Sequence, residues 1–465
     1  MSVDLVIKNG RIVTHAGVTR EGIAANKGKV VAIADESLLP PANKTIDANG
    51  KYILPGLIDP HCHYGYPAPF ETHLTADTQS SAAGGVTTFG HFLRSQTQSA
   101  LEMLPEHKRV IEKDSLIDGL FHIIAVGGFL DDILKLPKEG VNSFKFLMGY
   151  KGLTGARGEK RGPINDGIIF DGFEKISKLG RPAWAMVHAE NIELIQMLAK
   201  RLQEQGRKDM AAWEESRPYF CEAEAMRKAI YFAQITGCPL YVVHMTIGDG
   251  VDLIIKARAE GINVVAETCP WCLTHTSTEP VPLFQKYPTL GNVNPPLRNR
   301  ESIEKLWQAI KDGWISTIGS DYAPVTREEK ESQDIWHCIP GIGACSEMIL
   351  PVMLSEGVNK RQLPLEKVAE VCSYNTAKIF GIFPEKGTIA VGSDADMVIV
   401  DLNKKVKVTP DVLHTPPELC DWTIYDGWEF TGWPVATILR GNVIVEDGKI
   451  VGKPGNAKWL HCKCE

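Results

Sequence analysis

The sequence has no apolar run that reaches the roughly 18 residues of a membrane-spanning helix. Its first residues, MSVDLVIKNG, also lack the basic region and apolar core of a signal peptide. The formal net charge is -7, which argues against nucleic acid as a main partner. The 11 cysteines, an odd number, do not have the spacing of a disulfide scaffold. We therefore expect a reduced, cytoplasmic protein that binds neither membranes nor nucleic acid.

The two ends of the chain share one pattern. Residues 1–53 contain short alternating runs of β-branched residues, such as DLVIKNGRIVT, separated by Asn-Gly and Lys-Gly pairs that are typical of hairpin turns. Residues 390–465 return to this pattern in ADMVIVDL and ATILRGNVIVEDGKIVG. A sandwich needs two sheets, and neither end alone has enough strands. We therefore predict that both termini build one small β-sandwich domain.

Residues 54–389 alternate between strand and helix patterns. Helical stretches such as NIELIQMLAKRLQEQG and GVDLIIKARAEG end in glycine, a usual helix stop. The apolar runs between them are GLIDPHCH, VTTFGHF, LFHIIAVGG, FKFLMGY, WAMVHAE, LYVVHM, INVVAETCP and ISTIGSDYA. Eight strands alternating with helices predict an α/β fold, a closed (β/α)8 barrel of the TIM type. Residues 151–170, rich in glycine and charge, are predicted to form a mobile loop.

Polar side chains close five of these apolar runs. They are His61, His63, Lys145, His188, His244 and Asp321. A single histidine at such a place is more often a core or surface residue, but the carboxyl ends of barrel strands meet at one face. The two imidazoles of a His-x-His pair also point to the same side, because side chains alternate along a strand. Such groups are costly to bury without a partner, and a pair of divalent cations is the simplest partner.

Lys145 is the unusual member of this set. A lysine in the mouth of a barrel loses its water shell, which favours the neutral amine. One interpretation is a structural lysine that pairs with Asp321. The other is that the amine reacts with carbon dioxide to form a carbamate, whose two oxygens could bridge two metal ions.

Several motifs together resemble the hydantoinase and dihydropyrimidinase branch of the amidohydrolase superfamily. The motifs are GLIDPHCH, GVNSFKFLMGYKG, VHAEN, ETCP, NPPLR, SDYAP and NTAKIFGIFPEKGTIAVGSDADMVIVDL, and the resemblance extends over essentially the whole chain. It implies an enzyme that opens a cyclic amide or imide, of the hydantoin or dihydropyrimidine type, with a metal-bridging hydroxide. It also implies a homotetramer.

The resemblance implies roles for single residues. His61 and His63 would bind one metal ion, and His188 and His244 the other. The pair is usually zinc, with manganese or cobalt as possible substitutes. Carboxylated Lys145 would bridge the two ions. Asp321 would bind a metal and move protons, and Tyr150 would donate a hydrogen bond to the developing oxyanion.

Three positions depart from the pattern of the family. Asn294 stands where serine is usual, His337 where asparagine is usual, and Tyr322 where histidine commonly follows the last aspartate. We expect these residues to contact the substrate and to alter its choice. The aromatic residues within 64–70 could hold an apolar substituent, so we expect weak activity on dihydrouracil.

Other functions remain open on the sequence alone. The same metals could serve a hydrolase of a linear carbamate, urea or amide, or an allantoinase. Dihydroorotase fits less well, because Tyr64 and Gly65 stand where that branch has a carboxylate-binding arginine. A non-catalytic, dihydropyrimidinase-like assembly protein is the alternative outside enzymes. The complete ligand set argues against it.

Overall fold

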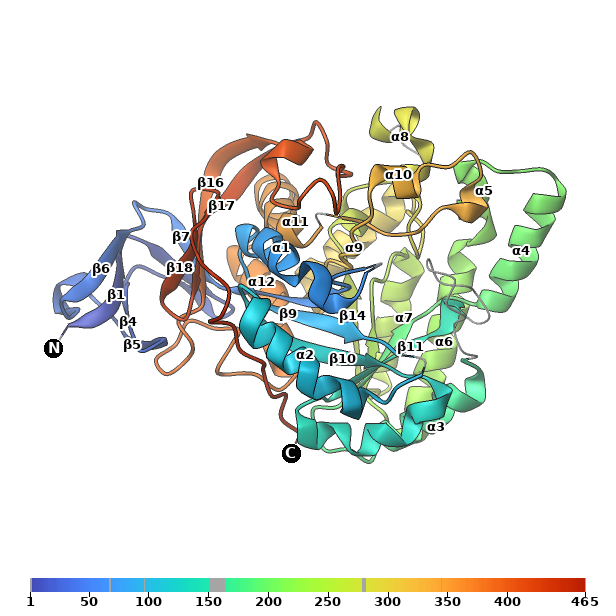
Figure 1. Ribbon diagram of the computed structural model, residues 1–465, viewed down its shortest axis with the longest axis horizontal. Helices are drawn as coiled ribbons and strands as arrows, with labels where there is room; N and C mark the ends of the chain where they lie inside the picture. The colour runs from blue at the N-terminus through green and yellow to red at the C-terminus, as the bar shows by residue number, and fades with distance from the viewer. Residues whose placement is uncertain are drawn as a thin grey trace.

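The computed structural model describes residues 2–66, 68–95, 97–150, 164–277, 282–343 and 345–464. Most of the predicted mobile loop therefore lies outside the described residues. Figure 1 shows the sheets of the chain ends on one side of the molecule and the α/β region on the other. Within the described ranges, no helix is both long and apolar enough to cross a membrane.

The α/β region is a nearly closed parallel barrel. Its eight strands run in chain order around the sheet, and each pairs with the next. They are β8 (Leu57–Cys62), β9 (Val86–Leu93), β10 (Asp118–Ile124), β11 (Ser143–Leu147), β12 (Trp184–His188), β13 (Leu240–Val242), β14 (Val264–Thr268) and β15 (Thr317–Ile318). A parallel bridge between Cys62 and Tyr322 brings the last strand back to the first. The prediction of a (β/α)8 barrel is confirmed.

Helices cover the outside of the barrel. The longer ones are α1 (Phe70–Ala83), α2 (Ala100–Asp114), α3 (Asp166–Ile176), α4 (Ile192–Glu204), α6 (Tyr219–Thr236), α7 (Gly248–Ala259), α9 (Arg300–Asp312) and α11 (Cys345–Val352). Shorter ones are α5 (Met210–Ser216), α8 (Pro282–Lys286), α10 (Arg327–Lys330), α12 (Leu365–Ala369) and α13 (Asn375–Ile379). Helix α9 shows why they form: the side chain of Asn299 caps the first turn, Gly313 ends the helix with φ 82°, and one face is buried.

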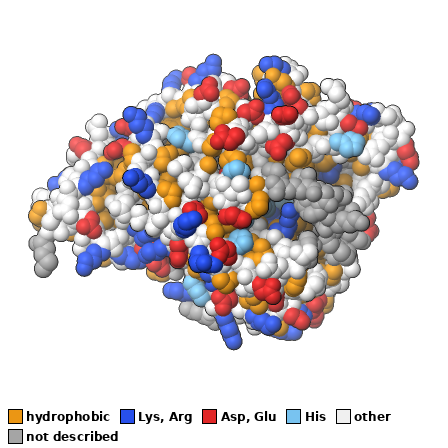
Figure 2. All heavy atoms as spheres, viewed as in Figure 1, with side chains coloured by type: hydrophobic (Ala, Val, Ile, Leu, Met, Phe, Trp, Pro, Cys, Tyr) orange, Lys and Arg blue, Asp and Glu red, His pale blue; other side chains and the backbone are white. Residues whose placement is uncertain are grey.

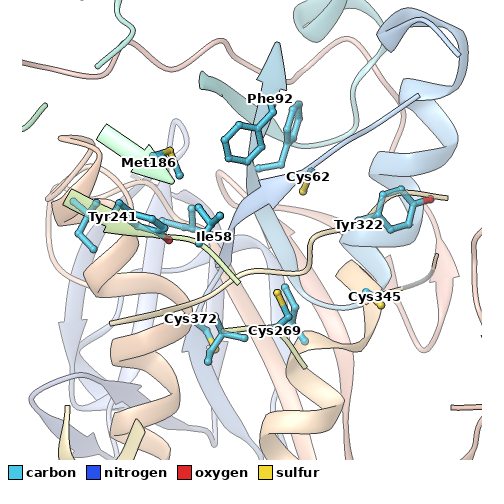
Figure 3. Close-up of a cluster of buried hydrophobic side chains, with 14 of the residues drawn as sticks. Ile58, Cys62, Phe92, Met186, Tyr241, Cys269, Tyr322, Cys345 and Cys372 are labelled. Carbon is cyan, nitrogen blue, oxygen red and sulfur yellow. The ribbon is translucent and has the colours of Figure 1, made fainter. Parts of the chain in front are cut away.

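The strands of the barrel are buried on both faces, as expected of a parallel sheet covered by helices. Every residue of β9 and β10 is buried. Figure 3 shows part of this interior, including Cys62 and Cys269. Both cysteines are fully buried, as small packing residues should be.

The two chain ends form two further sheets. One contains β1 (Val3–Lys8), β4 (Gly22–Asn26), β5 (Lys29–Ala34) and β6 (Ala42–Asp47). The other joins strands from both ends: β2 (Arg11–Thr14), β3 (Gly17–Thr19), β7 (Tyr52–Pro55), β16 (Met397–Lys407), β17 (Glu429–Leu439), β18 (Asn442–Glu446) and β19 (Lys449–Ile450). Side chains of both sheets share one apolar cluster, which contains Leu5, Ile23, Ile53 and Ile399. The predicted β-sandwich built from both termini is confirmed, and its boundaries at residues 53 and 390 stay a prediction.

The C-terminal segment runs back along the barrel, as the red trace in Figure 1 shows. The Gly119 N–H donates to Lys458 O at 3.0 Å, and the Leu460 N–H donates to Gly119 O at 2.8 Å. The Cys462 N–H donates to Gly140 O at 3.0 Å. This segment is therefore tied to the end of the barrel at which β10 begins.

Candidate active site

The structure brings the six predicted polar residues together at the carboxyl ends of the barrel strands. His61 lies in β8, Lys145 in β11 and His188 at the end of β12. His63, His244 and Asp321 follow β8, β13 and β15. The shortest approaches are Lys145 Nζ to His61 Nε2 at 2.7 Å, His188 Nδ1 to His244 Nε2 at 2.9 Å and His61 Nε2 to Asp321 Oδ1 at 3.1 Å. His63 Nε2 lies 3.4 Å from Asp321 Oδ1.

An unusual backbone conformation presents two of these residues. His244 has φ 36° and Asp321 has φ 53°, both in the left-handed region that a side chain disfavours. Such conformations persist only where the surrounding structure enforces them, and they are frequent at functional sites. Strands β13 and β15 end two and three residues earlier, and the turned backbone that follows keeps both side chains at the centre.

The arrangement of donor atoms fits divalent metal ions. Donor atoms of His61, His244 and Asp321 all lie within 4.8 Å of one another. His61 Nδ1 contacts Glu267 Oε1 at 2.6 Å, and His188 Nε2 contacts Glu190 Oε2 at 2.7 Å. In a neutral ring those contacts place the proton on the outer nitrogen, so the inner one keeps its lone pair. His244 Nδ1 is buried and has no hydrogen-bond partner among the described residues. A buried polar atom without a partner calls for an explanation, and a ring that binds a metal ion would supply one.

The charge states of three of these groups suit metal binding as they stand. His61 differs, because Glu267 and Asp321 outweigh burial and raise the pKa of its imidazole. Burial lowers the pKa of His63 to about 3 and that of His244 well below its ordinary value, so both imidazoles are neutral at pH 7. Burial alone would raise the pKa of Asp321. The neighbouring His61, His63 and His244 outweigh it and hold that pKa well below its usual range. Neutral imidazoles and an ionised carboxylate are the forms that bind metal ions.

The sequence analysis missed the residues that hold the predicted metal ligands in place. Glu267 at the end of β14 accepts hydrogen bonds from the His244 N–H at 3.0 Å and from the Tyr241 hydroxyl at 2.7 Å, in addition to its contact with His61. Glu190, two residues after His188, has the same role for that ring. The motifs ETCP and VHAEN contain these carboxylates. Their position beside strand ends was the signal that could have found them.

The group of donor atoms opens onto a cavity of about 400 Å³. Much of its wall is aromatic or aliphatic, and it includes Phe92, Leu147, Trp271 and Ile342. Tyr150 and Asn294 both line it, and Asn294 Nδ2 donates to the Tyr150 hydroxyl at 3.3 Å. The predicted roles of these two residues toward a substrate stay a prediction.

Two predicted substrate contacts do not line the cavity in the described residues, and their roles toward a substrate stay predictions. Tyr322 is fully buried, lies outside the cavity wall and donates its hydroxyl proton to Asp77. His337 has a side chain that is 78% exposed, and the segment Pro340, Gly341 and Ile342 lines the cavity in its place. Residue spacing in a loop does not show which residue turns inward.

Comparisons with known proteins agree with this geometry. Residues 186–444 match the family described as the amidohydrolase family. L-hydantoinase from Paenarthrobacter aurescens is 35% identical, with 98% of each chain covered. D-hydantoinase from Geobacillus stearothermophilus is also 35% identical, with 98% of this chain and 96% of the relative covered.

A solved structure, dihydropyrimidinase from Brevibacillus agri NCHU1002, superimposes with a TM-score of 0.89 at 30% identity. The match covers 99% of this chain and 98% of that one. The fold, the strand-end histidines and the sequence similarity over nearly the whole length lead to the same assignment. The chain belongs to the amidohydrolase family, in the branch of the hydantoinases and dihydropyrimidinases.

Proposed function

We propose that this protein hydrolyses a ring C–N bond of a cyclic amide or imide, of the hydantoin or dihydropyrimidine type. The observation that carries the proposal is that His61, His244 and Asp321 converge beside a cavity of about 400 Å³, and that His244 and Asp321 line it. Sites of this kind, concave and mostly apolar with a few converging polar groups, take small molecules.

The proposed ligands are the six strand-end residues: His61, His63, carboxylated Lys145, His188, His244 and Asp321. Two divalent ions, zinc in the first place, would lower the pKa of a water molecule and polarise the substrate carbonyl. The carbamate would form when the Lys145 amine adds to carbon dioxide and loses a proton. Lys145 Nζ lies 2.7 Å from His61 Nε2, within the group of ligands that such a bridge would join.

Asp321 is the proposed proton carrier. Its low pKa keeps it ionised at neutral pH, so it can accept a proton from the attacking water. Its side chain is 19% exposed and lines the cavity, so it can return that proton to the departing nitrogen. Without this second proton transfer the ring nitrogen would have to leave as an anion, which is a poor leaving group.

Tyr150 and Asn294 would orient the ring. The Tyr150 oxygen accepts from Asn294 Nδ2, and its O–H would donate to the carbonyl oxygen that gains charge. Asn294 Oδ1 is buried and has no hydrogen-bond partner among the described residues. An N–H of the substrate, such as that of a cyclic amide, is a donor that would satisfy it.

A substrate screen of metal-loaded protein tests the proposal. It should include hydantoins, dihydrouracil, allantoin and cyclic imides beside linear carbamates and ureas. Ring-opened product is expected from at least one cyclic compound, and the Asp321→Asn protein is the matched control. Turnover of linear compounds alone would show that the ring assignment is wrong.

We also propose a homotetramer in the cytoplasm, by analogy with the family.

A further inference from the structure

Asp77 is a buried carboxylate for which the proposed chemistry has no use. It lies in α1, it is 0% exposed, and its pKa is shaped by no basic side chain of the described residues. Burial raises the pKa of Asp77 to about 7, and hydrogen bonds from Gly65 and Tyr322 only partly oppose this. A buried carboxylate without a cation destabilises a fold, so its presence calls for another reason.

Each oxygen of Asp77 accepts a hydrogen bond from a different part of the site. The Gly65 N–H donates to Oδ2 at 2.8 Å. The Tyr322 O–H donates to Oδ1 at 2.8 Å. Asp77 therefore links the segment that follows β8 to the segment that follows β15.

Tyr322 connects this carboxylate to the proton carrier. The left-handed conformation of Asp321 lets Asp321 reach the cavity while the next side chain turns away from it. In Figure 3 the hydroxyl of Tyr322 points away from Phe92 and Cys62. The backbone oxygen of Tyr322 also accepts the His63 N–H at 2.8 Å. The position of Tyr322 is thus coupled to two of the proposed metal ligands.

Gly65 connects the carboxylate to the cavity wall. It has φ 79°, and a Cβ atom there would lie 2.5 Å from Pro69 O, so the chain folds back on itself at this point. The residues on both sides of the turn, here called the cavity segment, face the cavity: Tyr64, Tyr66, Ala68, Pro69 and Phe70. The polar groups proposed to hold the ring, Tyr150 and Asn294, come from other parts of the chain. The cavity segment is thus placed to meet the substituent of a ring.

We propose that Asp77 and Tyr322 are positioning residues that fix the cavity segment relative to Asp321 and so determine which ring substituents the enzyme accepts. The wall that this segment offers, Tyr66, Ala68 and Phe70, suits an apolar or aromatic substituent. This inference rests on the proposed function. Tyr322 is also one of the positions at which the sequence departs from the pattern of the family.

Steady-state kinetics of Tyr322→Phe tests the inference, because the variant loses one hydroxyl and keeps the ring. Tyr425→Phe is the matched control, since Tyr425 is also fully buried but lies outside the cavity wall and receives a hydrogen bond from Thr274. For zinc-loaded Tyr322→Phe, the KM for 5-benzylhydantoin should rise about tenfold, and the KM for hydantoin should stay within about twofold. Asp77→Asn should show the same split, and the control should show none.

Hydrogen exchange of the same proteins supplies a second test that needs no substrate. Amide exchange at residues 63–66 should accelerate in Tyr322→Phe and stay at the wild-type rate in Tyr425→Phe. An equal rise of KM for both rings, or unchanged exchange at these amides, overturns the inference. If the wild type opens neither ring, the proposed function fails, and the exchange result alone decides the role of Asp77 and Tyr322.

Discussion

Two groups of buried acidic or imidazole side chains lie at opposite ends of the barrel. At the carboxyl ends of the strands, His61, His244 and Asp321 converge, and His244 and Asp321 line a cavity. At the amino end of β10, Asp118 lies against Asp394 and Asp396 from the segment that enters β16. Both groups have the residue types and the spacing of a metal site. The two groups differ in the charged residues that surround them.

The second group is balanced by cations of the protein itself. Lys386 Nζ lies 2.5 Å from Asp118, 2.8 Å from Asp394 and 2.6 Å from Asp396. Burial would lower the pKa of Lys386, but these three carboxylates outweigh it and raise the pKa above its usual value. Arg440 also pairs with Asp118, and Lys29 pairs with Asp394. The group joins the barrel to the terminal sheets, whereas the imidazoles and the carboxylate at the other end lie beside a cavity.

Figure 2 shows that both signs of charge are interspersed over the visible surface as well. A carboxylate cluster therefore points to a ligand only when the protein does not supply the countercharge. The predictions below test whether one group serves chemistry and the other stability.

The largest effect is expected from Asp321→Asn. The amide cannot accept and return a proton, and general acid–base groups contribute roughly 100- to 10,000-fold to a rate. We expect kcat to fall about 1,000-fold or more, while the melting temperature changes little. The measurement is turnover of the best substrate together with metal content. A loss below about tenfold would mean that another group carries the proton.

Lys386→Met should have the opposite effect, a loss of stability with little change in turnover. Removal of one partner from a buried ion pair leaves uncompensated charge, which costs about 3–5 kcal/mol of stability. Denaturant unfolding should show this loss, while kcat of the folded fraction stays close to the wild-type value. A change in KM with unaltered stability would contradict a purely structural role for this group.

Glu267→Gln should also lower activity with little change in stability, but by less than Asp321→Asn. Glu267 orients His61 and holds the His244 backbone, and loss of such a supporting group typically weakens metal binding about 10- to 100-fold. Metal titration followed by elemental analysis is the measurement. Excess metal should restore most of the activity, which distinguishes this variant from Asp321→Asn.

A pH dependence of stability is the smallest effect. Glu347 accepts from His414 at 2.7 Å and raises the pKa of His414 to about 9. Because this pKa lies above the unfolded value of 6.5, the stabilisation is complete below pH 6.5 and is lost as the pH rises through 9. We expect about 1 kcal/mol in total, since the side chain is 23% exposed and solvent screens the pair. Unfolding of His414→Gln between pH 6 and pH 10 should lack this slope.

The sequence allowed the barrel to be predicted strand by strand, because parallel strands buried on both faces are continuous apolar runs. Polar residues that close those runs, such as His188 and Asp321, could be placed for the same reason. His337 could not be placed, since nothing in a loop's composition shows which residue faces inward. Asp77 and Glu267 were missed because a carboxylate within a helix or strand is expected to lie at the surface until the structure shows that it is buried.

The C-terminal segment that returns to Gly119 and Gly140 joins parts of the chain that are synthesised at very different times. Domains generally form from the N-terminus as the chain is made. Here β10 emerges early, yet the partners of its first residues, from Lys458 to Leu460, emerge more than 300 residues later. Until these residues have been made, the amino end of the barrel lacks these backbone hydrogen bonds. The carboxylate of Asp118 likewise lacks its ion pairs with Lys386 and Arg440 until those residues have been made. Loss of this segment should therefore reduce the yield of folded protein far more than the activity of the molecules that do fold.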